Sequence, residues 1–147
     1  MAFCRDGKAL LVADYSTGLH RVDLATGQTA PLGGLRTGMA GTDGLLAAPG
    51  VDGLRNASPL PFGVIATQNG VSPQRVMLLR ISADCREVEG ADLVAANLPG
   101  VDDITLAAVD RDEVVFVGHA RWAHRGDDGK QALTQPPPIR VFRATLP

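Results

Sequence analysis

A pattern of short apolar runs recurs three times along the chain, and this recurrence constrains the fold more than any other feature. The runs begin at Leu10, Val64 and Val115, and each ends in polar residues. Their starts lie 54 and then 51 residues apart. A second apolar segment follows each run, at residues 19–24, 76–81 and 139–144. Self-similarity at a near-constant period of this size is typical of a repeat fold.

The first repeat unit predicts four short strands. Asp6–Lys8 is a turn sequence between the apolar stretches Met1–Cys4 and Ala9–Ala13. In Leu19–Leu24 the residues His20, Val22 and Leu24 share one face, in the period of two that marks a half-buried strand. A glycine-containing turn then leads to a short outer strand at Thr29–Leu32. The unit is therefore predicted to be one up-and-down antiparallel sheet.

The second unit shows the same order of segments. Its predicted strands are Thr42–Ala47, Gly63–Gln68, Arg75–Ser82 and Glu87–Ala95. Pro49–Pro61 is rich in Gly, Pro, Asn and Ser, so we expect an inserted surface loop there. Helical periodicity is weak everywhere; Ala91–Leu98 is the best helix candidate and is short.

The third unit has three predicted strands and a long polar loop. The strands are Asp103–Val109, Glu113–Gly118 and Ile139–Leu146. The loop Arg121–Pro138 joins the second strand to the third and contains the stiff, extended run Pro136–Pro138.

These units predict an all-β fold, a partial β-propeller of about three four-stranded antiparallel blades. We expect a single partial domain over residues 1–147, with blade units near 1–40, 41–98 and 99–147. The 17 glycines and 10 prolines favour short elements joined by tight turns. A β-sandwich is the alternative, but it does not explain why the strand patterns recur in the same order.

Composition excludes several kinds of partner. The formal net charge is −2 without a basic stripe, so we expect no nucleic-acid partner. No apolar run approaches the ~20 residues that span a bilayer, so we expect no membrane partner. Met1–Asp6 lacks a signal-peptide layout. The compartment is therefore cytoplasmic if the chain is complete, and an upstream signal peptide is the alternative.

The two cysteines, Cys4 and Cys85, lie far apart in the sequence and lack the spacing of a metal site. Buried, unpaired thiols are the favoured interpretation, and a disulfide is the less favoured alternative.

The opening residues resemble a propeller turn of the regucalcin/gluconolactonase-like (senescence marker protein) family. The segment Met1–Asp14 is similar to that family's apolar pair, Phe-Ser, Asp-Gly-Lys turn and strand ending in Ala-Asp. Leu19–Gly27 is similar to its following strand and turn, and Thr42–Leu45 to the Asp-Gly opening of its next blade. The resemblance covers most of the chain and is strongest over residues 1–47.

The resemblance implies a six-bladed propeller that hydrolyses sugar lactones with a divalent cation, Ca or Zn, in its central channel. It implies that Asp43 is a metal ligand and the general base, because this residue matches the Asp of the blade opening. The family's Asn-Gly phrase would fall immediately before Met1, and the Glu of the family's first blade has no match. The chain is therefore expected to correspond to the C-terminal half of such a propeller.

Blade geometry predicts further site residues at the end of the propeller where Asp43 lies. In each blade the first strand starts at this end and the second strand returns to it, which gathers polar residues from separate blades. Asn69 and Asp103 are the further metal-ligand candidates, since Ca²⁺ needs several converging oxygen ligands. His119 and Trp122 are the substrate-binding candidates. Each has a structural alternative: Asn69-Gly70 and Asp102-Asp103 also suit turns.

Two hypotheses for function follow. The first is the C-terminal half of a metal-dependent sugar-lactone hydrolase, inactive alone, with the lactone as its small-molecule partner. The second is a non-catalytic propeller module that binds a ligand or a protein. Either way, an open ring of blades predicts self-association or association with a missing N-terminal half, because two sheet faces would lack a packing neighbour.

Overall fold

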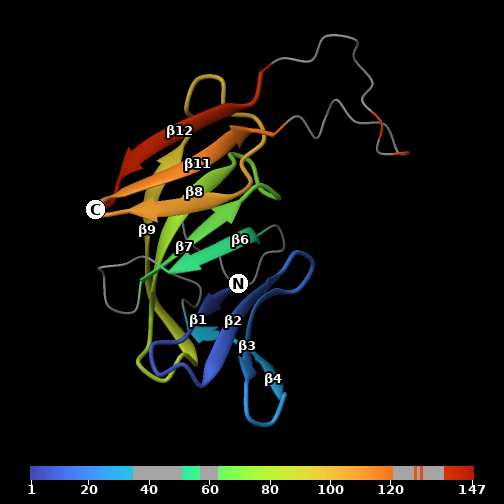
Figure 1. Cartoon of the computed structure of the whole chain (residues 1–147), viewed down its shortest axis with the longest axis vertical. Coiled ribbons are helices and arrows are strands. Elements are labelled where there is room, and N and C mark those ends of the chain that lie inside the picture. Colours follow the sequence, from blue (N-terminus) through green and yellow to red (C-terminus); the bar gives the residue numbers. More distant parts are fainter. Residues whose placement is uncertain (35–50, 57–62, 121–127, 129, 131–137) are drawn as a thin grey trace.

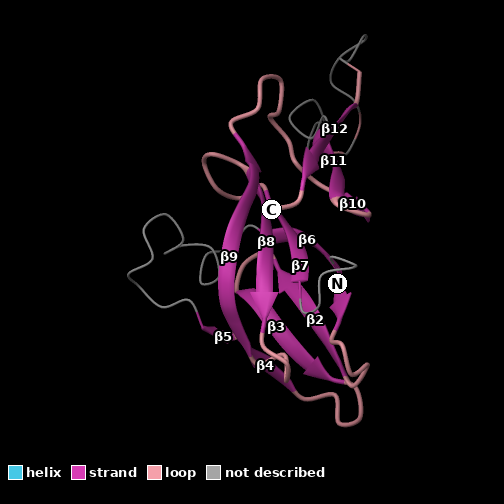
Figure 2. Cartoon of the chain, turned by 90° about the vertical axis from the view of Figure 1, so that its left-hand side faces the viewer, coloured by secondary structure: helices cyan, strands magenta, loops and turns pink. Residues whose placement is uncertain are grey.

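The computed structural model describes residues 1–34, 51–56 (backbone only), 63–120, 128, 130 and 138–147. These residues form strands, arranged in three sheets that lie one after another along the molecule (Figures 1 and 2). Nearly all strand pairs are antiparallel. The predicted all-β class is confirmed. The described strands form no closed ring of sheets.

The first sheet has four antiparallel strands in the order in which they follow one another in the sequence. They are β1 (Ala2–Phe3), β2 (Ala9–Asp14), β3 (Gly18–Asp23) and β4 (Thr29–Pro31). The strands turn where the sequence predicts, because Gly7 and Gly27 adopt the positive φ values of 67° and 70° that tight turns require. All four predicted strands of this unit are confirmed.

The second sheet contains three strands that the sequence predicts and two that it does not. The predicted ones are β7 (Gly63–Gln68), β8 (Arg75–Ile81) and β9 (Glu87–Ala96). The other two are β5 (Gly33–Gly34) and β6 (Val51–Asn56). The sheet order is β5-β9-β8-β7-β6, in which β5 pairs with β9 in parallel.

Two sequence predictions for this unit are wrong. The expected loop Pro49–Pro61 contains β6 (Val51–Asn56), because this backbone gains hydrogen bonds from the neighbouring β7 despite its weak local strand propensity. The helix candidate Ala91–Leu98 lies mostly in β9, where pairing with β8 fixes an extended backbone. The predicted opening strand Thr42–Ala47, including Asp43, lies outside the described residues.

The third sheet has three strands, as predicted: β10 (Ala107–Asp110), β11 (Glu113–His119) and β12 (Arg140–Thr145). Its first strand begins later than the predicted Asp103. The segment before β10 instead lies beside the end of β11, where Asp103 forms an isolated parallel bridge with His119.

The middle sheet is buried on both faces. One hydrophobic cluster joins it to the first sheet and includes Val64, Ala66 and Leu79. A separate cluster joins it to the third sheet and includes Ile65, Leu78 and Phe116. Residues of β7 and β8 thus alternate between two cores, and every residue of β7 is buried. The three sheets are stacked face to face in sequence order.

A disulfide links the first two sheets. Cys4 and Cys85 are bonded, with their Cα atoms 6.1 Å apart, and are 5% and 4% exposed. The expectation of buried cysteines is confirmed, but that of unpaired thiols is wrong. Stacking of the sheets brings two distant parts of the sequence together at a separation that a disulfide spans.

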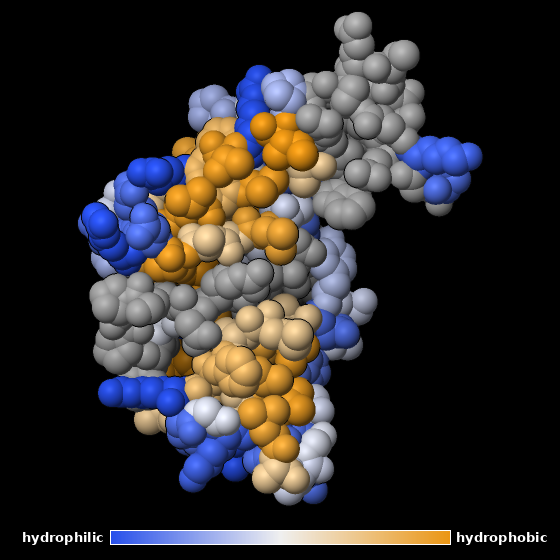
Figure 3. All heavy atoms as spheres, in the orientation of Figure 1, coloured by the Kyte–Doolittle hydropathy of each residue, from blue (hydrophilic) through white to orange (hydrophobic). Residues whose placement is uncertain are grey.

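The outer faces of the stack carry exposed apolar side chains. Val141 is 62% exposed on the face of the third sheet opposite to the buried Phe116 and its stacked neighbour Phe142. In the orientation of Figure 3, hydrophobic residues gather over the third sheet at the top and the first sheet at the bottom. Within the described ranges, the chain has no helix of the length and apolar character needed to cross a membrane.

Candidate functional site

The C-terminal ends of β2, β7 and β11 lie at the same side of the stacked sheets, on the right in Figure 1. This arrangement arises because β2, β7 and β11 run in the same direction. The side therefore receives Asp14 from the first sheet, Gln68 and Asn69 from the second, and His119 from the third. We refer to these residues with Gln74, Arg75 and residues 102–105 as the polar end.

His119 contacts an aspartate at the polar end. Its Nδ1 atom is hydrogen-bonded to Oδ1 of Asp102. The backbone holds the two residues together, since the amide of Asp102 donates to the carbonyl of Gly118 at 3.0 Å. His119 is 8% exposed, whereas the Asp102 side chain is 62% exposed. The carboxylate therefore fixes the ring orientation of a largely buried imidazole.

Asp103, a predicted metal ligand, sits beside this pair. Its amide also donates to the carbonyl of Gly118, at 3.3 Å, and it bridges to His119 along the backbone. The structure thus brings the predicted residues Asp103 and His119 together, and the Asp102 side chain contacts the imidazole.

Gln74 links the second and third sheets at the polar end, and sequence reasoning missed it. Its side-chain Nε2 donates to the carbonyl of Asp102 at 3.1 Å, and its Oε1 accepts from the amide of Ile104 at 2.8 Å. Both bonds span about thirty residues of sequence. Neither partner is local, so the only sequence signal was that Gln74 directly precedes a strand.

Gln68 and Arg75 form a second polar contact on the face of the middle sheet turned toward the first sheet. The two residues are register partners, and Arg75 Nε donates to Oε1 of Gln68 at 2.8 Å. Gln68 is fully buried. Burial lowers the pKa of the Arg75 guanidinium, because a charged group is less well solvated there.

Asn69, a predicted metal ligand, follows β7 directly. Its Oδ1 atom is buried and has no hydrogen-bond partner among the described residues, and the same holds for Nε2 of Gln68. Buried polar atoms of this kind are uncommon, and bound water or an ion often accounts for them.

Asp14 stabilises its own turn. Its Oδ1 accepts from the amides of Ser16 and Thr17 and from the Thr17 hydroxyl, at 3.0, 2.7 and 2.7 Å. These hydrogen bonds, the Thr17 hydroxyl foremost, hold the pKa of the Asp14 carboxyl below its ordinary value. Asp14 is therefore a turn residue at the polar end.

The described side chains do not by themselves make a cation site. No group of three or more His, Cys, Asp or Glu side chains in the described ranges is arranged to hold a metal ion. Two of the predicted site residues, Asp43 and Trp122, lie outside the described residues. What the polar end offers chemically is an oriented imidazole, exposed carboxylates and carboxamides.

No protein-family model matches the chain, and no curated protein or solved structure matches it significantly.

Proposed function

We propose that the three sheets are consecutive blades of a β-propeller, and that the polar end forms part of the ligand site of a sugar-lactone hydrolase. The observation that carries the proposal is the burial of both faces of the middle sheet by its neighbours in sequence. Blades of a propeller pack in this way, and their ends meet around a central channel. The similarity of residues 1–47 to gluconolactonase-like propellers supplies the substrate class.

The proposal assigns Asp43, Asn69 and Asp103 to a divalent cation, and Asp43 also to activation of water. His119 and Trp122 would contact the sugar. Of the cation ligands only Asn69 and Asp103 are described, and two oxygen donors are fewer than the six to eight that Ca²⁺ takes. The site therefore needs donors beyond the described residues.

The test combines metal binding with an assay on a panel of sugar lactones. The purified chain is titrated with Ca²⁺, Zn²⁺ and Mn²⁺ by calorimetry, alone and as the Asp43→Ala variant. Heat that disappears in Asp43→Ala but persists in Asp6→Ala, a turn carboxylate between β1 and β2, supports the proposal. Absence of binding at millimolar metal contradicts the assignment of the cation.

A non-catalytic ligand-binding module is the second candidate, and a specific observation favours it. Asp102 contacts His119, and the Gln74 side chain is bonded to backbone atoms, so these groups stabilise the polar end itself. A lactone or sugar acid that raises the melting temperature without being hydrolysed, with or without metal, would favour this candidate over the hydrolase.

We also propose that the outer faces of the stack bind further sheets, in a second copy of the chain or in a separate chain that carries further blades. Both faces of the middle sheet are covered in this way, each by a neighbouring sheet. Light scattering at micromolar concentration should show an oligomer. Val141→Asp on the outer face should weaken it, whereas Leu93→Asp, an equally exposed position on β9, should not. A stable, well-folded monomer of the unmodified chain would contradict self-association.

A further inference from the structure

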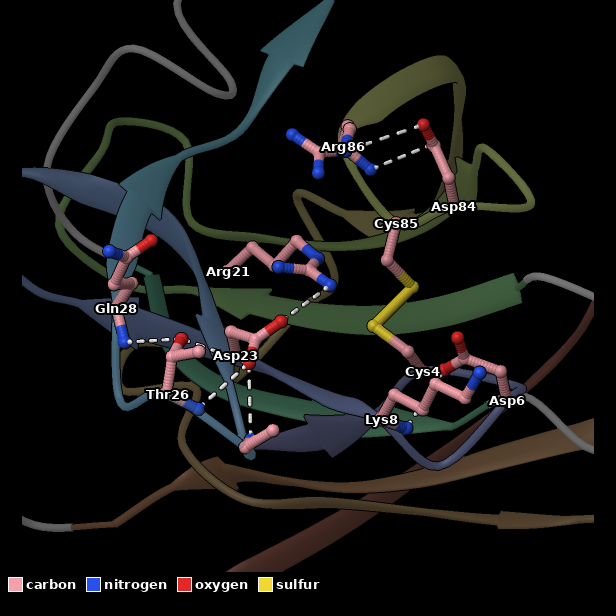
Figure 4. Close-up of polar contacts among 11 residues, drawn as sticks. Cys4, Asp6, Lys8, Arg21, Asp23, Thr26, Gln28, Asp84, Cys85 and Arg86 are labelled. Carbon is pink, nitrogen blue, oxygen red and sulfur yellow. Dashed lines mark hydrogen bonds and ion pairs between the residues drawn. A yellow bond between two sulfur atoms is a disulfide. The ribbon is translucent and has the colours of Figure 1, made fainter.

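The Cys4–Cys85 disulfide connects two turns that belong to different sheets. Cys4 directly follows β1 in the first sheet, and Cys85 lies in the turn between β8 and β9 of the second. The residues are 81 positions apart in the sequence. Figure 4 shows the two side chains joined by the disulfide between the sheets. The bond therefore closes a large loop of the chain.

The turn that carries Cys4 is held in place by its own hydrogen bonds. The Cys4 amide donates to the carbonyl of Ala9 at 2.9 Å, and the Cys4 carbonyl accepts from the amide of Gly7 at 3.0 Å. The Asp6 side chain accepts from the amide of Lys8 at 2.9 Å.

The turn that carries Cys85 is equally well defined. The Cys85 amide donates to the carbonyl of Ser82 at 2.9 Å, and Cys85 adopts a φ of 57°. The Ser82 hydroxyl oxygen accepts from the amides of Arg86 and Glu87, at 3.1 and 3.0 Å, and donates to Asp84. Both cysteines are thus positioned by local structure.

Both cysteines also belong to the hydrophobic cluster between the first two sheets, beside Ala2, Leu11 and Ile81. With exposures of 5% and 4%, neither is open to a reductant or a competing thiol in the folded chain. A surface disulfide that exchanges readily would not be enclosed in this way. The enclosure is that of a structural bond.

We propose that this disulfide is a structural cross-link acquired in an oxidising compartment, and that the protein acts outside the reducing cytosol. Disulfides that persist are characteristic of such compartments. Two thiols lose two protons and two electrons as the S–S bond forms, and a disulfide oxidant such as oxidised glutathione is reduced to two thiols. The inference does not depend on the proposed function.

The first test uses the unmodified chain, refolded with either oxidised or reduced glutathione. After denaturation without reductant, iodoacetamide should label neither cysteine of the oxidised sample and both of the reduced one. Peptide mapping should recover a Cys4–Cys85 cross-linked peptide. The equilibrium constant for unfolding should be about two-thousandfold smaller for the oxidised chain, as expected for a closed loop of this length. Labelling of both thiols after oxidative refolding would overturn the proposal.

Variants and expression provide the second test. Cys4→Ser/Cys85→Ser should match the reduced chain in stability, and each single variant should leave one labelled thiol. Expressed in bacteria, the chain should be cross-linked in the periplasm and a dithiol in the cytosol. A periplasmic dithiol, or a double variant as stable as the oxidised chain, would contradict a structural cross-link. If the double variant does not fold, comparison of the oxidised and reduced unmodified chain decides the question.

Discussion

The two interfaces of the middle sheet follow the same packing plan but are secured differently. The interface with the first sheet contains a disulfide within its hydrophobic cluster. The interface with the third sheet contains a cluster of similar residue types, secured at the polar end by the hydrogen bonds of Gln74 to the 102–104 segment. One interface is thus fixed covalently and the other by polar contacts, so redox conditions and polar substitutions should affect them separately.

The largest effect should come from reducing the disulfide. The chain-entropy model gives a loss of about 4.5 kcal/mol in the free energy of unfolding for a loop closed by residues 81 positions apart. Hydrogen exchange should show lost protection in β1–β4 before any loss in β10–β12. Equal loss of protection in the first and third sheets would show that the two interfaces are not independently secured.

A matched pair of leucines on β8 sharpens the comparison. Leu79 faces the first-sheet cluster and Leu78 the third-sheet cluster, and both are buried. Each Leu→Ala change should cost about 3 kcal/mol by leaving a cavity. In the oxidised chain, only Leu78→Ala should allow the third sheet to lose its hydrogen-exchange protection early. Identical exchange patterns for the two variants would contradict this difference.

Replacement of Gln74 tests the polar connection directly. Gln74→Ala removes one donor and one acceptor and leaves the amide of buried Ile104 without this partner, which should cost about 2 kcal/mol in urea denaturation. Gln74→Glu retains the acceptor for Ile104 but not the donor to Asp102, so its loss should be smaller. The His119 ring signals in NMR spectra should shift in both variants, since residue 102 is held less firmly. Unchanged stability in both variants would remove Gln74 from the interface.

The smallest effect should be seen in acid. Hydrogen bonds lower the pKa of Asp14, Asp23 and Asp84 below the ordinary value of 3.8; the leading contributors are the Thr17 hydroxyl, the Thr26 amide and the Ser82 hydroxyl. When the folded-state pKa of a carboxyl is lowered, the stabilisation is fully present above the unfolded-state pKa. It is lost as the pH falls through the folded-state pKa. In Asp14→Asn the free energy of unfolding should therefore fall slightly less steeply as the pH is lowered, as measured by urea denaturation at several pH values. Asp110→Asn, at the end of β10, provides the control in the third sheet.

The hairpins were predictable from the sequence because their signals are local. Alternating residues and turn glycines gave β2 and β3, and an apolar run gave β7 with both bounds correct. In contrast, β6 has no apolar run and exists through its pairing with β7. The two-residue β5 depends on β9, more than fifty positions away. Sequence patterns do not record such non-local pairing.

The candidate site was predictable only in outline. The strand directions placed Asn69, Asp103 and His119 at one end of the sheets, and the structure has these segments there. The side-chain partners were not predictable, because Asp102 and Gln74 acquire their roles from packing of one sheet against another. The Cys4–Cys85 disulfide was only the less favoured alternative for the same reason.

The parallel pairing of β5 with β9 bears on the order in which the protein assembles during synthesis. Gly33 and Gly34 lie directly against Glu87 and Val88, and a side chain at Gly34 would meet the Val88 carbonyl oxygen at 2.2 Å. The β5 segment leaves the ribosome well before its partner does. The first sheet can form its hairpins early, but β5, which follows the last strand of that sheet and belongs to the second, must wait until residues 87–88 have been translated. Premature termination before that point would therefore leave β5 without a strand to pair with, although the first sheet would be complete.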